Sequence, residues 1–204
     1  MLPLYLASAS PRRRELLLSL GLSFCVLPTE IDESVLPGEG AQNHVVRLAA
    51  KKAATVAGAL RDRKVAALVL AADTTVAIDG TILGKPTDGP DALSMLRRLA
   101  GARHEVLTAC RLVRTDDGRA AATVAITGVR FNPWNEPLAR WYVGTGESMD
   151  KAGAYGIQER GVLLCSGIDG SWSNVVGLPL ESLPPLFREV GDDLLARLAG
   201  RKSG

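Results

Sequence analysis

The stretch "KVAALVLAAD", Lys64–Asp73, is the most hydrophobic run of the chain, and it decides the fold. Its apolar residues do not alternate with polar ones, so we expect a strand that is buried on both faces. The residues that follow it, "TVAIDGTIL", hold Asp79 and Gly80 between β-forming residues, which predicts a tight hairpin. The sequence therefore predicts a covered central sheet.

Helical and strand-like segments alternate on both sides of this run. Serine, proline and glycine mark the ends of the first helix, and antiparallel strands dominate the middle of the chain. The expected strands are Leu2–Ala7, Ser23–Pro28, Glu105–Arg114, Ala120–Phe131 and Val162–Ser166, and the expected helices are Pro11–Leu20, Gln42–Leu60, Asp88–Leu99 and Asn135–Val143. The C-terminal region is expected to be helical, with a break near Pro184 and Pro185 and a frayed tail at 199–204.

This order predicts an α/β fold, a mixed twisted sheet with flanking helices. We expect a single domain over residues 1–204, with two lobes around a cleft.

Composition narrows the classes of function. The net charge is +2, so bulk electrostatics require neither nucleic acid nor a membrane as a partner. No apolar stretch reaches the roughly 20 residues of a membrane span, and no signal peptide is expected, which indicates a soluble, cytoplasmic protein. Cys25, Cys110 and Cys165 are expected to be small buried hydrophobes, and His44 and His104 have no partner at metal-ligand spacing.

The segment "LASASPRRRELL", Leu6–Leu17, places cations where a helix normally carries acids. Ser10 is an N-cap, and the three arginines after its proline lie at the positive end of the helix dipole. A strand, a serine loop and a helix N-terminus form a common anion-binding arrangement, and guanidinium groups suit phosphate oxygens. Ser8, Arg12 and Arg13 are therefore candidate phosphate ligands, whereas Arg14 is expected to face water. The alternative is a solvated basic face.

Two carboxylates are candidates for chemistry. Asp73 ends the apolar run, and the carboxyl end of a buried strand is where open α/β sheets place ligands. It could act as a metal ligand or a general base, or it could cap a helix or pair with a lysine. Glu33 lies in an acidic loop and is either a second metal ligand or a solvated acid. Thr74 could reach the ligand.

Three further residues complete the candidate site. Lys52 and Lys85 could bind phosphates, although "LGKP" lacks the spacing of a nucleotide-binding P-loop and both could be surface lysines. The segment Gly144–Gly161 is rich in glycine, which lets backbone come close to a ligand. Within it, Gln158 offers the donor and the acceptor that recognition of a base edge requires. The alternative is a plain flexible loop.

Seven motifs, in this order, resemble the Maf family, nucleoside triphosphate pyrophosphatases once described as septum-formation inhibitors. They are "LASASPRRRELL", "IDE" (Ile31–Glu33), "RLAAKKA" (Arg47–Ala53), "AADTTV" (Ala71–Val76), "LGKP" (Leu83–Pro86), "DKAGAYGIQ" (Asp150–Gln158) and "NVVGLPL" (Asn174–Leu180). They span nearly the whole chain. The last two resemble the subgroup that acts on dTTP and UTP. Trp172 and Ala9 depart from the residues expected at their positions, which affects fine selectivity at most.

The resemblance implies an inosine triphosphate pyrophosphatase-like fold with the active site in the cleft. It implies hydrolysis of dTTP, UTP or modified pyrimidine nucleotides to the monophosphate and pyrophosphate, by metal-dependent attack of water at the α-phosphorus with Mg²⁺ or Mn²⁺. It places the catalytic base at Asp73, metal binding at Asp73 and Glu33, and substrate binding at Ser8, Arg12, Arg13, Lys52, Thr74, Lys85 and Gln158. A homodimer is the assembly expected, and neither nucleic acid nor a membrane is expected as a partner of the enzyme.

Two other functions stay open on the sequence alone. The basic helix could hold RNA, DNA or a partner from the division machinery, in a protein without catalysis. An aromatic content of 4% leaves little stacking surface for single strands, which argues against this. The second alternative is a phosphatase that releases orthophosphate, and its products would distinguish it.

Overall fold

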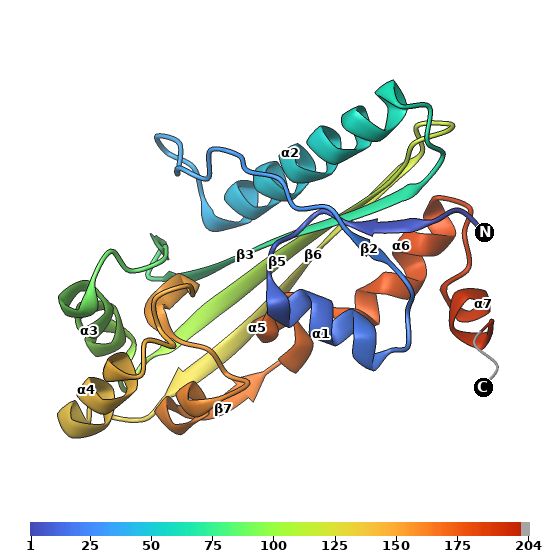
Figure 1. The fold of residues 1–204 in the computed structure, drawn as a ribbon. Coiled ribbons are helices and arrows are strands. Elements are labelled where there is room, and N and C mark those ends of the chain that lie inside the picture. The colour runs from blue at the N-terminus through green and yellow to red at the C-terminus, as the bar shows by residue number, and fades with distance from the viewer. Residues whose placement is uncertain (201–204) are drawn as a thin grey trace.

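The central run forms strand β3 (Leu68–Ile78), in the middle of a seven-stranded mixed sheet, in the computed structural model, which describes residues 1–200 (Figure 1). The strand order is β2-β1-β3-β5-β6-β7, and β4 pairs with the far end of β3. β1 (Leu4–Leu6) and β2 (Cys25–Val26) run parallel to β3, whereas β4 (Thr81–Leu83), β5 (Arg103–Arg114), β6 (Ala120–Phe131) and β7 (Cys165–Asp169) continue the sheet by antiparallel pairing. The predicted mixed sheet is confirmed.

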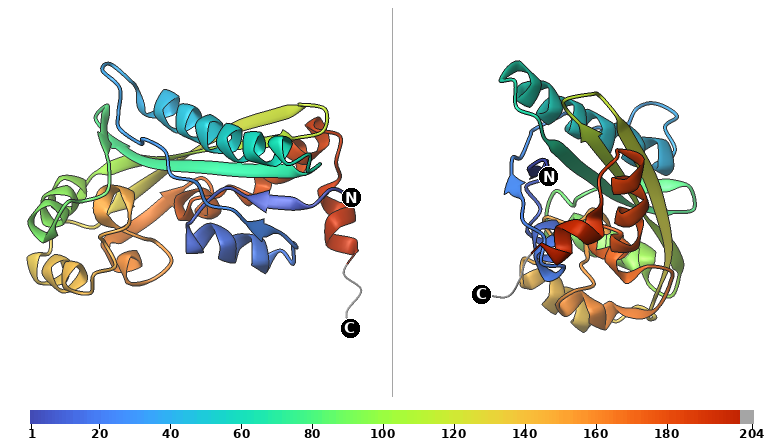
Figure 2. Two further views of the ribbon diagram at one scale, coloured as in Figure 1. Left: turned by 45° about the horizontal axis from the view of Figure 1, so that its top comes forward. Right: turned by 90° about the vertical axis from the view of Figure 1, so that its right-hand side faces the viewer.

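Helices cover both faces of the sheet, as predicted (Figures 1 and 2). The long helix α2 lies over β3 and β5 on one face, and α1, α5 and α6 lie on the other face. The helices are α1 (Pro11–Ser19), α2 (Ala41–Asp62), α3 (Gly89–Leu99), α4 (Glu136–Gly144), α5 (Trp172–Val176), α6 (Leu183–Glu189) and α7 (Leu194–Ala199), and the 3₁₀ turns are η1 (Ala152–Ala154), η2 (Arg160–Leu164) and η3 (Leu180–Ser182). Within residues 1–200, none of the helices combines the length and apolarity of a bilayer span.

Two hydrophobic clusters divide this second face along the length of β3. Ala72 packs into a cluster with α1 and α6, and Val76 packs into another with α3 and α4. Asp73 and Thr74 lie between these clusters. Successive residues of a strand point to opposite faces. The side chain of Asp73 therefore points toward α2, and that of Thr74 points toward α1 and α5. The middle of β3 therefore presents polar groups on both faces of the sheet.

Asp73 does not end its strand, which corrects the sequence-based prediction. β3 continues to Ile78 because Thr74, Thr75 and Val76 favour strand, and because β5 pairs with it along nearly its whole length. The strand that ends near Asp73 is β1, whose last residue, Leu6, is opposite Leu70. Among the described residues, no strand pairs with β3 on the β1 side between Leu70 and Val76, where pairing with β4 begins. Asp73 lies within this gap and lines the cavity that opens there.

Several boundaries also differ from the prediction. The strand expected from Val162 begins at Cys165, because η2 occupies the preceding residues. The two prolines at 184–185 do not break a helix but lie in the first turn of α6, where a missing N–H costs nothing. The break follows α6 at Gly191, which has a φ of 71°. The Asp79–Gly80 hairpin is confirmed, with φ values of 49° and 73°.

The prediction of buried cysteines is wrong for Cys25, which is exposed on the edge strand β2, whereas Cys110 is buried and Cys165 is half-buried. The prediction of a frayed tail falls, for residues 201–204, outside the described residues.

Candidate active site

A cavity of about 560 Å³ opens beside β3 at the point where β1 leaves the sheet. Its walls come from the start of α1, the acidic loop, α2, β3, the loop after β4, the segment 150–158 and the end of α5. All nine side chains predicted from the sequence line it: Ser8, Arg12, Arg13, Glu33, Lys52, Asp73, Thr74, Lys85 and Gln158. The fold therefore brings together residues that are spread over 150 positions of the sequence.

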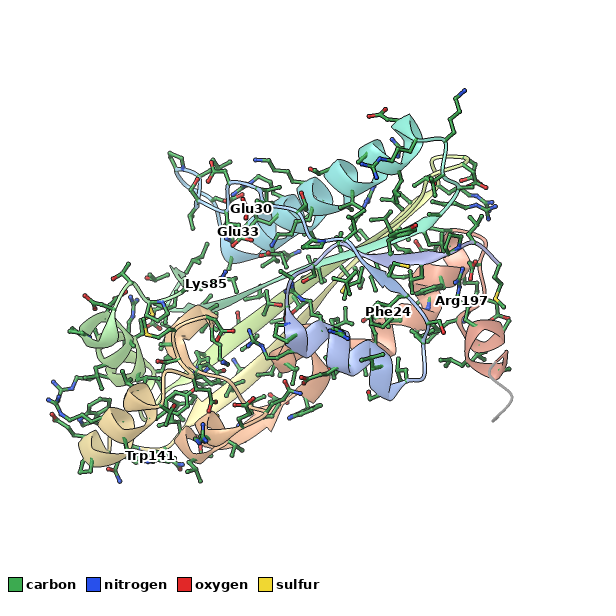
Figure 3. The ribbon with its side chains drawn as sticks, viewed as in Figure 1. Phe24, Glu30, Glu33, Lys85, Trp141 and Arg197 are labelled. Atoms are coloured by element: carbon green, nitrogen blue, oxygen red, sulfur yellow. The ribbon has the colours of Figure 1, made fainter. Side chains whose placement is uncertain are left out.

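A lysine joins the two candidate acids. Lys52 Nζ lies 2.6 Å from Asp73 Oδ1 and 2.6 Å from Glu33 Oε1, and Lys85 Nζ lies 3.6 Å from Glu33 Oε2. Lys52 points inward because it shares one face of α2 with His44 and Leu48, at intervals of four residues. Figure 3 shows Glu33 on the loop before α2, with Lys85 opposite it.

Glu33 is held in its charged form. Partial burial raises the pKa of Glu33, but hydrogen bonds and attraction from Lys52 and Lys85 outweigh that effect and bring the pKa below its ordinary value. The two lysines thus keep a negative charge beside Asp73 at neutral pH.

Arg13 is a buried cation without a carboxylate partner among the described residues. Its Nε donates to the carbonyl oxygen of Gly177 at 2.8 Å, Nη1 donates to Ser8 Oγ at 3.1 Å, and Nη2 donates to Thr74 Oγ1 at 3.0 Å. Burial lowers the pKa of Arg13, and the negative charge of Asp73 opposes that shift. A guanidinium stays protonated in proteins. The site therefore holds a positive charge whose hydrogen-bond acceptors, one carbonyl and two hydroxyl groups, are all uncharged.

Arg12 reaches across the mouth of the cavity. Its Nη1 donates to Asp150 Oδ2 at 2.9 Å, although the two residues are 138 positions apart. Partial burial raises the pKa of Asp150, but Lys151 and Arg12 outweigh it, so the pKa lies below its ordinary value. Arg14 is exposed, as predicted. Asp150 is absent from the predicted site, and its place in the glycine-rich segment is the signal that could have found it.

A buried pair fixes the segment that carries Gln158. His104 Nε2 lies 2.8 Å from Tyr155 Oη, and both rings pack edge-to-face with Phe131. Tyr155 also lines the cavity, so its ring joins the cavity wall to the core. Burial, aided by the charge of Arg103, lowers the pKa of His104 to about 4.

This shift predicts an acid-sensitive fold. Because the folded pKa of His104 lies below the ordinary value of 6.5, its contribution to stability is complete above pH 6.5 and is lost as the pH falls toward 4. We expect the free energy of unfolding, measured by urea titration, to fall by about 2–3 kcal/mol between pH 7 and pH 4.5. In His104→Asn, the free energy of unfolding should change much less between these two pH values. In the control His44→Asn, it should fall as much as in wild type. An equal decrease in His104→Asn would contradict the assignment.

The donor set suits a hard divalent cation together with a polyphosphate. The described residues contain no group of three or more acids, histidines or cysteines that could hold an ion unaided. The carboxylates of Asp73 and Glu33 each contact the ammonium group of Lys52 through one oxygen. The second oxygen of each carboxylate does not contact this ammonium group. Mg²⁺ commonly takes one or two carboxylates and completes its shell with water and substrate phosphates. The residues therefore fit Mg²⁺ or Mn²⁺.

Fold and site define an α/β protein whose cavity surrounds two acids with cations, an environment for a polyanion. A family model described as "Maf-like protein" matches residues 3–190. The chain belongs to this family.

Relatives match over most of their length. A dTTP/UTP pyrophosphatase of Anaeromyxobacter sp. (strain Fw109-5) is 50% identical over 195 residues, which cover 94% of this chain and 91% of the relative. A dTTP/UTP pyrophosphatase of Symbiobacterium thermophilum is 44% identical over 200 residues, 98% of this chain and all of the relative. A nucleoside-triphosphatase / dITP/XTP pyrophosphatase structure from Mycobacterium abscessus overlaps 64% of this chain and 73% of its own, at 14% identity and a TM-score of 0.35, which is too weak to support an inference.

Proposed function

We propose that the protein hydrolyses dTTP and UTP to the monophosphate and pyrophosphate, by attack of water at the α-phosphorus. The observation that carries the proposal is the convergence of Asp73, Lys52 and the unpaired Arg13 on one cavity. Relatives named dTTP/UTP pyrophosphatase, 44% and 50% identical over most of the chain, support this class of substrate.

Asp73 is the proposed base. Lys52 occupies Oδ1, and no described residue donates to Oδ2, so this oxygen is the one that accepts a proton from water. As the water oxygen bonds to the α-phosphorus, the bond to the bridging α–β oxygen breaks and pyrophosphate leaves. Lys52, Lys85 and Arg13 offset the negative charge of the phosphates, which is the largest contribution a protein makes to phosphoryl chemistry.

We further propose that Asp73 and Glu33 hold Mg²⁺ or Mn²⁺ when the triphosphate binds. The ion would supply charge neutralisation at the phosphate oxygens. Ser8 and Thr74 orient Arg13, and Gln158 offers a donor and an acceptor to the pyrimidine edge.

Product analysis tests the proposal against its alternatives. With Mg²⁺, dTTP and UTP should yield the monophosphate and pyrophosphate in equal amounts, faster than ATP or dGTP. Release of orthophosphate with the diphosphate would instead show a phosphatase. No turnover, together with nucleic-acid binding that weakens steeply with salt, would favour the regulatory alternative.

Replacement of Arg12 by Ala should weaken triphosphate use without unfolding the protein. Arg12 is charged, lines the cavity and, among residues 1–200, is bonded only to the exposed Asp150. Its loss therefore removes phosphate affinity, while exposed ion pairs contribute little to stability. We expect KM for dTTP to rise about tenfold, with a thermal midpoint within about 2 °C of wild type. Arg14→Ala, on the same helix turn, is the matched control. An equal KM in the two variants would show that Arg12 does not bind substrate and belongs to a solvated basic face.

A further inference from the structure

We propose that Thr108, a buried residue of β5 outside the cavity, is a positioning residue that orients Arg13 through Thr74. The inference rests on the proposed function, in which Arg13 binds phosphate. Thr108 is completely buried and is not among the residues that line the cavity, so it would act without contacting a ligand.

A row of hydroxyl groups leads from Arg13 into the sheet. Thr74 and Thr108 are directly opposite each other on β3 and β5, and their Oγ1 atoms lie 2.9 Å apart. Thr74 Oγ1 accepts from Arg13 Nη2, and Thr108 Oγ1 donates to the carbonyl oxygen of Asn174 at 3.1 Å. Asn174 is itself fully buried, and its Nδ2 donates to Thr127 Oγ1 at 2.8 Å, so the far end of the row is fixed.

The chemistry of the two ends sets the direction of every hydrogen bond in the row. The carbonyl of Asn174 can only accept, so the single proton of the Thr108 hydroxyl is committed to it. Thr74 then donates its own proton to Thr108 Oγ1, which at 2.9 Å is much closer than its other acceptor, the carbonyl oxygen of Gly177 at 3.4 Å. The guanidinium of Arg13 can only donate, and it does so to a lone pair of Thr74 Oγ1.

This direction has a consequence for each side chain that lines the cavity. Thr74 has no proton left for a ligand, so it supports Arg13 and does not donate to substrate. Each of the three guanidinium nitrogens of Arg13 donates one hydrogen bond within the protein. One N–H remains on Nη1 and one on Nη2, and these two donors on one guanidinium are available to phosphate oxygens. Thr108 thereby fixes, through Thr74, one of the three contacts that orient these donors.

The test removes the Thr108 hydroxyl while keeping the shape of the side chain. Thr108→Val leaves Thr74 free to turn its proton elsewhere, so we expect KM for dTTP to rise about tenfold, the value of one well-placed hydrogen bond, with little change in kcat. Thr108→Ser keeps the hydroxyl and should return KM to within about twofold of wild type.

Two comparisons separate positioning from general damage. Thr115→Val is the matched control, since Thr115 is also buried and its hydroxyl is also hydrogen-bonded, to Val65 and Ala67, away from the cavity. The variant Arg13→Lys lacks the Nη2 donor. Adding Thr108→Val to this variant should raise KM for dTTP by less than about twofold over Arg13→Lys alone. The proposal is overturned if Thr108→Val behaves like Thr115→Val, or if its full effect persists beside Lys at position 13.

A binding measurement distinguishes failure of this inference from failure of the proposed function. Calorimetric titration with inorganic tripolyphosphate reports the Arg13 site without turnover. If wild type binds tripolyphosphate but does not hydrolyse dTTP, the proposed function fails, and weaker binding by Thr108→Val still supports the inference. If wild type hydrolyses dTTP while Thr108→Val binds tripolyphosphate as well as wild type does, the inference alone fails.

Discussion

Replacement of Asp73 by Asn is expected to lower kcat for dTTP by about 10²- to 10⁴-fold, the usual contribution of a general base. The amide cannot take the proton from water, and it offers a divalent cation a weaker ligand than the carboxylate. Lys52 keeps Glu33 at 2.6 Å, so no charge is left without a partner and the protein should stay folded. Steady-state release of pyrophosphate measures the effect.

Asp79→Asn is the control for this change. It makes the same chemical substitution at an exposed position of the β3–β4 turn, where asparagine accepts the positive φ. Its turnover should equal that of wild type. Near wild-type release of pyrophosphate by Asp73→Asn would remove Asp73 from the mechanism.

Replacement of Lys52 by Met is expected to cause the largest loss of stability. Lys52 and Asp73 are both more than nine-tenths buried, and removal of the ammonium leaves Asp73 unpaired and facing Glu33. Removing one partner of a buried ion pair costs about 3–5 kcal/mol. We expect a loss of this size in the free energy of unfolding at pH 7, measured by urea titration, together with a loss of activity.

The neighbouring lysine provides the control. Lys51 is exposed on the same helix, so Lys51→Met should change stability by less than about 0.5 kcal/mol. The double variant Lys52→Met, Asp73→Asn removes the buried charge as well as its partner, and it should regain much of the loss. Equal stability of Lys51→Met and Lys52→Met would contradict the paired arrangement.

The residue types of the site could be predicted from the sequence, but not its geometry. The sequence predicts Asp73 as a site residue because it follows the apolar run, at the expected carboxyl end of a buried strand, yet that strand end is wrong. The opening beside it depends on where β1 stops, and nothing in the apolar run fixes the length of a neighbouring strand. Arg12 and Asp150 are another such case, since their contact depends on the path of the chain between them.

Thr108 marks a second limit of sequence analysis. A threonine in an apolar strand is typical of any sheet, and its role depends on the register that sets it opposite Thr74. Register is decided by the packing of whole strands and by the lengths of their turns. The β3–β4 hairpin, in contrast, was predictable because two adjacent residues determine it.

The central claim, attack of water at the α-phosphorus, is tested most directly by hydrolysis of dTTP in ¹⁸O-labelled water. Mass spectrometry of the products then locates the oxygen that came from water. The mechanism predicts one ¹⁸O atom in dTMP and none in pyrophosphate. Label in the pyrophosphate would show attack at the β-phosphorus, and labelled orthophosphate with dTDP would show attack at the γ-phosphorus; either result would contradict the mechanism proposed for Asp73.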